Sequence, residues 1–150
     1  MRQNKYEMKT YLIIKTKIAS LLILFTLAGC ASAGDLKPFT TDGCSDFPNG
    51  TPKHQDLWLT CCIQHDLAYW MGGTYKERLE ADKELKACVE KVGEPAIANV
   101  MLAGVRVGGT PFLPTSFRWG YGWPYLRGYK ALTKEEQELV NKMLSGNKGE

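Results

Sequence analysis

The sequence predicts a small all-α domain that is built on an antiparallel pair of helices and stapled by disulfides. Two observations predict this fold class. Apolar residues at helical spacing fill residues 56–71 and 75–92, and the turn between them is so short that the two helices must lie antiparallel. The chain has 150 residues, the usual size of one domain, and four of its five cysteines form an even set of the kind that exported domains pair as disulfides.

The first thirty residues are expected to be a leader. Lys9, Lys15 and Lys17 precede the uncharged apolar run 18–28, which is the pattern of a secretory signal peptide. The run is short for a membrane span, which needs about 20 apolar residues. A transmembrane anchor is the alternative interpretation.

The leader ends in Leu27-Ala28-Gly29-Cys30, which resembles the lipobox of bacterial lipoproteins. This resemblance implies a signal peptide over 1–29, lipid on Cys30, a linker over 30–39 and a domain over 40–150. The lipid would hold the domain at a membrane. Ala31 follows the cysteine, as in lipoproteins of the bacterial outer membrane that face the periplasm. The alternative is ordinary cleavage near Ala31-Ser32-Ala33.

Charge excludes one class of partner. The chain has 19 basic and 16 acidic residues, and the leader holds five and one of them, which leaves 14 basic and 15 acidic residues. A nearly neutral domain without a basic cluster does not attract phosphate backbones, so nucleic acid is not expected as a partner.

The first helix is predicted over Asp56–Met71, and the Gly72-Gly73 pair ends it. Thr74 and Glu77 have the spacing of a capping box, so the second helix is predicted from about Tyr75 to Val92. Asp82 falls on the apolar stripe of this second helix. A carboxylate on an apolar face is costly unless a partner meets it.

The register of this hairpin pairs particular residues. Positions equidistant from the glycine turn face each other, which places Asp82 opposite His65 and Cys88 opposite Cys61. Adjacent helical residues point about 100° apart, so Cys61 and Cys62 are not expected to pair with each other. The register therefore favours the disulfides Cys61 with Cys88 and Cys44 with Cys62 over the swapped pairing.

The stretch Cys61-Cys62-Ile63-Gln64-His65-Asp66 lacks the cysteine spacing of structural zinc sites and of thioredoxin-like redox sites. Structural zinc sites and thioredoxin-like redox sites both use C-x-x-C, and oxidised cysteines do not bind metal. An imidazole held on one nitrogen by Asp82 can instead take a proton from water with the other nitrogen. Asp66 points elsewhere and suits a hard cation such as Ca²⁺. The alternatives are a core histidine and a helix salt bridge between Asp82 and Arg78.

The motif CC-x-x-HD-x-x-Y, which ends at Tyr69, resembles the active-site helix of secreted phospholipase A2. The resemblance covers about residues 40–92 and includes Asp82 and Cys88 at the family's spacing. It implies that His65 is the general base, that Asp82 orients it, that Tyr69 bonds Asp82, and that Asp66 binds calcium. The upstream loop would supply further calcium ligands through the carbonyl groups of Gly43, Ser45 and Phe47. The short link between the helices looks like the compact bacterial and fungal members.

The rest of the chain is predicted with less detail. An apolar helix is expected over 95–107, as core or as a substrate channel, and a capping box at Thr133 opens a last helix. The aromatic-rich segment 111–129 suits either a membrane interface or a wrap over the core.

The expected function is therefore calcium-dependent hydrolysis of the sn-2 ester of a glycerophospholipid at a membrane surface. One alternative is a non-enzymatic module on the same fold that binds lipid or a partner protein. Another is a hydrolase of a different ester.

Overall fold

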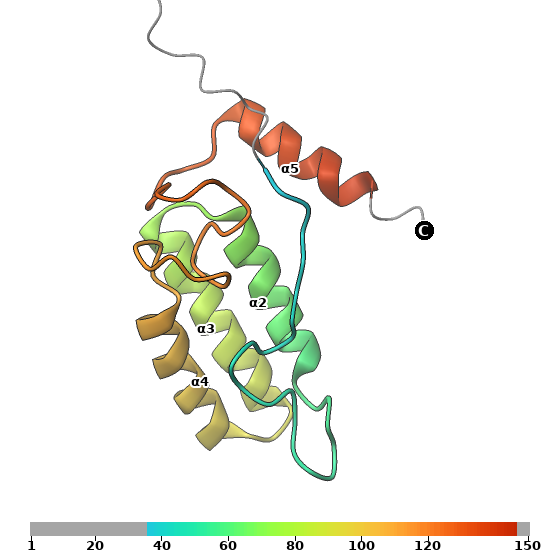
Figure 1. Ribbon diagram of the computed structural model, residues 1–150. Coiled ribbons are helices and arrows are strands. Elements are labelled where there is room, and N and C mark those ends of the chain that lie inside the picture. Colours follow the sequence, from blue (N-terminus) through green and yellow to red (C-terminus); the bar gives the residue numbers. More distant parts are fainter. Residues whose placement is uncertain (1–35, 147–150) are drawn as a thin grey trace, which may run out of the picture. The chain divides into compact units, whose positions relative to one another are not determined.

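The structure is a computed structural model that describes residues 36–146, and this part of the chain is all-helical (Figure 1). The expected leader over 1–29 and the lipid-bearing Cys30 lie outside the described residues. No helix within 36–146 has the length and apolar character needed to cross a membrane. The elements are α2 (Leu59–Met71), α3 (Tyr75–Lys91), α4 (Pro95–Gly108) and α5 (Lys134–Gly146). The predicted all-α class is confirmed for these residues.

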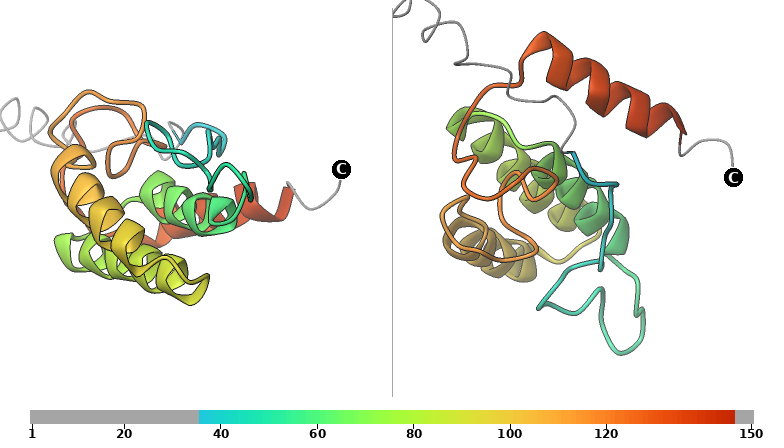
Figure 2. Two further views of the ribbon diagram at one scale, coloured as in Figure 1. Left: turned by 90° about the horizontal axis from the view of Figure 1, so that it is seen from below. Right: turned by 45° about the horizontal axis from the view of Figure 1, so that its top comes forward.

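The hairpin of α2 and α3 has the predicted turn. Gly72 and Gly73 have φ angles of 69° and 137°, in the region that favours glycine. The capping box then starts α3, because the Thr74 hydroxyl accepts from the Glu77 N–H at 3.3 Å and the Glu77 carboxylate accepts from the Thr74 N–H at 2.7 Å. Figures 1 and 2 show the two helices side by side and antiparallel.

The first helix begins three residues later than predicted, at Leu59 instead of Asp56. The N–H of Trp58 donates to the Asn49 carbonyl at 3.0 Å, and the Trp58 indole donates to the Pro48 carbonyl at 2.6 Å. These contacts hold Trp58 against the preceding loop. Residues 56–58 therefore form a turn that leads into the helix.

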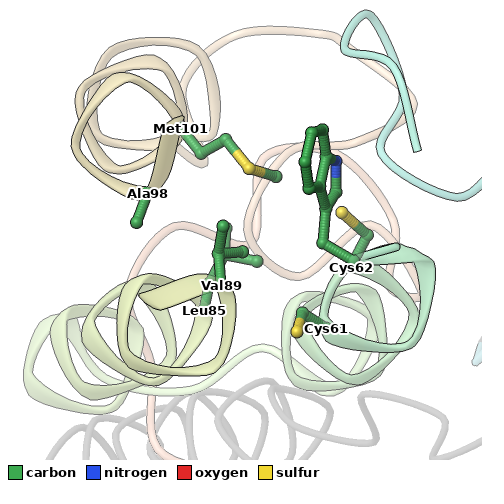
Figure 3. Packing of buried hydrophobic residues seen from close by; sticks show 7 residues of the cluster. Cys61, Cys62, Leu85, Val89, Ala98 and Met101 are labelled. Atoms are coloured by element: carbon green, nitrogen blue, oxygen red, sulfur yellow. The ribbon is translucent and has the colours of Figure 1, made fainter. Parts of the chain in front are cut away.

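The core around the hairpin is closed by α4, which packs against α3. Figure 3 shows Met101 and Ala98 of α4 facing Leu85 and Val89 of α3, with Cys62 of α2 on the opposite side. The predicted third helix is thus part of the core on one face. Its other face carries exposed apolar side chains, such as Val100 and Val107.

Both predicted disulfides are present. Cys61 is bonded to Cys88, which joins α2 to α3, and Cys44 is bonded to Cys62, which joins the loop before α2 to that helix. Two adjacent residues of α2 are therefore cross-linked in two directions. This fixes the helix that carries His65 between the loop and α3.

Removal of either disulfide is expected to lower the free energy of unfolding by about 3–4 kcal/mol, because each bond closes a loop of roughly 20 to 30 residues in the unfolded chain. The variants are the double replacements Cys61→Ala with Cys88→Ala and Cys44→Ala with Cys62→Ala, which leave no unpaired thiol. Urea denaturation measures the change. A loss below about 1 kcal/mol in either variant would contradict the expectation that these bonds stabilise the fold.

The aromatic-rich segment wraps the end of the hairpin. The buried indoles of Trp119 and Trp123 donate to the carbonyls of Gly73 and Met71, at 2.8 and 2.7 Å. In the same segment Phe112 and Tyr125 are exposed. The segment therefore covers the core with its tryptophans and keeps part of its aromatic surface outside.

The last helix, α5, follows a second capping box formed by Thr133 and Glu136, as predicted. Its buried Val140 packs with Leu36, Trp70 and Trp123. Arg127 donates two hydrogen bonds of 2.8 Å to the two carboxylate oxygens of Glu136, which ties the aromatic segment to α5.

Candidate active site

The hairpin brings His65 and Asp82 together inside the protein. His65 Nε2 lies 2.9 Å from Asp82 Oδ1, and the Asp82 side chain is fully buried. This is the juxtaposition that the helix register predicts. The two residues come from neighbouring helices whose relative position is fixed by the Cys61–Cys88 disulfide.

The charge of Asp82 sets the direction of this hydrogen bond. Burial alone would raise the pKa of Asp82, but hydrogen bonds from His65, Tyr69 and Arg106 outweigh it and hold the pKa below its usual value. The carboxylate is therefore ionised and can only accept. His65 Nε2 must carry the proton, and a neutral imidazole then has its lone pair on Nδ1.

Tyr69 completes the contacts of Asp82 Oδ1. Its hydroxyl donates to this oxygen at 2.7 Å, and its ring lies 4.2 Å from the His65 ring, centre to centre. Burial, together with the negative charge of Asp82, raises the pKa of Tyr69 well above its ordinary value, so the hydroxyl stays protonated and remains a donor. The predicted contact between Tyr69 and Asp82 is thus present in the structure.

A cavity of about 340 Å³ lies beside His65. Its walls come from α2, α3, α4, the loop before α2 and the segment after α4, and most of the lining is apolar. The apolar side chains include Leu85, Val100, Met101, Val105 and Phe117. Among residues 36–146, no lysine or arginine lines it. An apolar cavity with a few polar groups at one side is the usual form of a small-molecule site.

Asp66 lines the same cavity and is almost fully buried. Its Oδ2 accepts a hydrogen bond from the Thr41 hydroxyl at 2.7 Å. Burial raises the pKa of Asp66 to about 6, despite this hydrogen bond. Within the described part of the chain no lysine or arginine forms an ion pair with it, so a buried carboxylate lacks a cationic partner.

The loop of residues 43–47 lines the same cavity as Asp66. Gly43 and Ser45 have positive φ angles, and the Cys44 N–H donates to the Asn49 side chain at 2.9 Å. The Cys44 carbonyl accepts from the Phe47 N–H at 3.1 Å. The carbonyls of Gly43, Ser45 and Phe47, by contrast, accept no hydrogen bond from any residue in 36–146.

These groups fit a hard cation. Carboxylate and backbone carbonyl oxygens are the ligands that Ca²⁺ prefers, and residues that can offer both kinds line the cavity. Side chains alone would not suffice, since residues 36–146 contain no cluster of three or more histidine, cysteine, aspartate or glutamate side chains suited to a metal. Loop carbonyls would have to supply most of the ligands.

Three contacts of this site were not predicted from the sequence. Thr41 bonds Asp66, Arg106 bonds Asp82 at 2.6 Å, and Arg78 donates to the Tyr69 hydroxyl at 3.0 Å. The alternative ion pair of Asp82 with Arg78 is also present, with Arg78 Nε 3.8 Å from the carboxylate, beside the contact with His65. Arg106 is 24 residues from Asp82 in the sequence, and only the packing of α4 brings it there.

Comparison of the chain with protein-family models, with curated protein sequences and with solved structures finds no match.

Proposed function

We propose that this protein hydrolyses the sn-2 ester of a glycerophospholipid at a membrane surface, with Ca²⁺ as cofactor and His65 as general base. One observation carries this proposal. The buried Asp82 holds His65 by Nε2, and the imidazole lines an apolar cavity that also contains the Asp66 carboxylate. A base, a cation site and an apolar cavity are the three parts that such a reaction needs.

In this proposal, His65 Nδ1 accepts a proton from a water molecule as its oxygen attacks the ester carbonyl. The imidazolium that forms is stabilised by the ionised Asp82, and the proton then passes to the departing alkoxide, which leaves as an alcohol. A bound Ca²⁺ would polarise the carbonyl and stabilise the developing oxyanion. Asp66 and the carbonyls of Gly43, Ser45 and Phe47 would hold that ion.

The substrate class follows from the cavity and from the surface around it. Apolar walls suit an acyl chain, and Val100 belongs both to the cavity lining and to the exposed apolar face of α4. The resemblance of the CC-x-x-HD-x-x-Y motif to secreted phospholipase A2 supports the same substrate. The resemblance to a secreted family also suits the export that the leader predicts, whereas the proposed lipid anchor rests on the separate lipobox resemblance at Cys30.

Fatty-acid release from phosphatidylethanolamine and phosphatidylcholine vesicles tests the proposal. Release is expected with Ca²⁺ and is expected to stop with a chelator, because the oxyanion then loses its counter-charge. Asp66→Asn should behave like the chelated wild type. Asp46→Asn is the matched control, since Asp46 also lines the cavity but is not assigned to the ion.

The stability of the same protein samples shows whether Ca²⁺ binds, independently of hydrolysis. Ca²⁺ at 100 times its dissociation constant is expected to stabilise the wild-type fold by about 2.7 kcal/mol, and Asp66→Asn should lose this gain. Release that continues in the chelator would contradict the role of calcium. No release from folded protein would favour a second candidate, a non-enzymatic module that binds lipid or a protein. The several contacts that bury Asp82 are also consistent with a purely structural role for that residue.

A further inference from the structure

The two oxygens of the Asp82 carboxylate have different partners. Oδ1 accepts hydrogen bonds from His65 and Tyr69, both on α2. Oδ2 accepts from Arg106 Nη1 on α4, at 2.6 Å. Arg78 Nε lies 3.8 Å from Oδ2, which is too far for a hydrogen bond. Arg106 is therefore the direct partner of the oxygen that faces away from His65.

Arg106 is itself held in a defined orientation. Its Nη2 donates to the Tyr75 hydroxyl at 3.1 Å, and its guanidinium carbon lies 5.3 Å from the centre of the Tyr75 ring. This distance suits a cation–π contact. Tyr75 and Asp82 lie about two turns apart on α3, so the planar guanidinium bonds two separate positions of that helix.

A second arginine makes the reverse connection. Arg78 of α3 donates through Nη2 to the carbonyls of Val105 and Arg106 on α4, at 2.7 and 3.0 Å. The two helices are thus interlocked by an arginine from each. Val105 also lines the cavity. The same hydrogen-bond network therefore joins the cavity wall at Val105 to Asp82, the residue that bonds His65.

We infer that Arg106 is a positioning residue for His65, because it fixes the rotation of the Asp82 carboxylate and so presents Oδ1 to His65 Nε2. The kinetic part of this inference rests on the proposed hydrolase, whereas the orientation of the imidazole does not. Without Arg106, Oδ2 keeps only the Arg78 contact at 3.8 Å, and the carboxylate can turn toward Arg78 against the hydrogen bonds that hold Oδ1. The imidazole would then lose its fixed tautomer.

Arg106 does not line the cavity. Its loss should therefore change turnover more than substrate binding. Arg106→Met is expected to lower kcat on the order of tenfold to a hundredfold with little change in KM, as for a misplaced catalytic group. Arg106→Lys keeps a charge near Oδ2 but loses the second bond to Tyr75, so it should recover part of the activity.

Nuclear magnetic resonance of the histidine rings distinguishes a positioning role of Arg106 from a purely stabilising one, because only the former changes the His65 ring signal. In ¹⁵N-labelled protein, the Nε2 proton of His65 should give a slowly exchanging signal in the wild type. In Arg106→Met this signal is expected to weaken or disappear, while the fold is retained. His54, which is exposed in a turn, is the internal reference in the same spectra.

Lys86→Met is the matched control, because it removes another ion pair on α3, that of Lys86 with Glu90, away from Asp82. If Arg106→Met does not fold, Tyr75→Phe replaces it, since this variant removes one of the two contacts that orient Arg106. Tyr75→Phe is then expected to lower kcat and to weaken the His65 signal, both by less than Arg106→Met.

The outcomes separate this inference from the proposed function. A wild-type His65 signal and an unchanged kcat in Arg106→Met would overturn the inference, even if the protein hydrolyses phospholipid. If the wild type releases no fatty acid, the proposed hydrolysis fails, and the His65 signal alone decides whether Arg106 positions the imidazole.

Discussion

Replacement of His65 by glutamine is expected to lower the rate of phospholipid hydrolysis by about 10²–10⁴-fold, the usual contribution of a general base. Glutamine has an amide N–H that can still donate to Asp82, but its carbonyl oxygen is far too weak a base to take a proton from water. The ester would then be attacked by a water molecule that no base deprotonates, which is a much weaker nucleophile. The measurement is the initial rate of fatty-acid release at saturating Ca²⁺.

This variant needs controls for fold and for calcium binding. His54→Gln removes the other histidine, which is exposed in a turn, and should leave the rate unchanged. His65→Gln should also keep the stabilisation by Ca²⁺, because Asp66 and the loop carbonyls are intact. A His65→Gln protein that retains more than about a tenth of the wild-type rate would show that His65 is not the base.

Replacement of Asp82 by asparagine is expected to lower the free energy of unfolding by about 3–5 kcal/mol, the usual cost when one partner of a buried ion pair is removed. Asparagine has almost the same shape but no charge. Arg106 and Arg78 would be left close together without their shared counter-ion, and Arg78 is 2 % exposed. Urea denaturation at pH 7 measures the loss.

The pH dependence of stability provides an independent check of Asp82. The pKa of Asp82 is lowered in the folded protein from its ordinary value of 3.8, so this group stabilises the fold above that pH. That contribution is lost as the pH falls below 3.8 toward the folded pKa. Below this pH the difference between wild type and Asp82→Asn should therefore shrink.

Glu84→Gln is the matched control, because Glu84 lies two residues further along α3 and is exposed. It should change stability by less than about 0.5 kcal/mol. Equal stability of wild type and Asp82→Asn at pH 7 would mean that the charge of Asp82 is not needed by the two arginines.

The hairpin could be predicted from the sequence because its signals are local. The capping box at Thr74, the glycine turn and the spacing of the cysteines specify α3, the register and the pairing of Cys61 with Cys88. The meeting of His65 and Asp82 follows from the same register. All of these sequence signals lie within the hairpin itself.

Contacts between elements far apart in the sequence could not be predicted in this way. Trp58 bonds to a loop ten residues earlier, which delays the start of α2. The position of Arg106 depends on how α4 crosses α3, and α4 is apolar around most of its circumference, so its sequence does not specify which side faces Asp82. The composition of the aromatic segment is compatible both with a wrap over the core and with a membrane contact. That Trp119 and Trp123 are buried is seen only in the structure.

The convergence of both disulfides on adjacent residues of α2 makes assembly of the proposed site depend on oxidising conditions. In a reducing cytoplasm neither bond persists, and the combined loss of roughly 6–8 kcal/mol is comparable to the whole stability of a small domain. Under such conditions the reduced chain would therefore lack an assembled site. For the proposed exported lipid hydrolase, oxidation after export would then assemble the site only once the chain has left the cytoplasm.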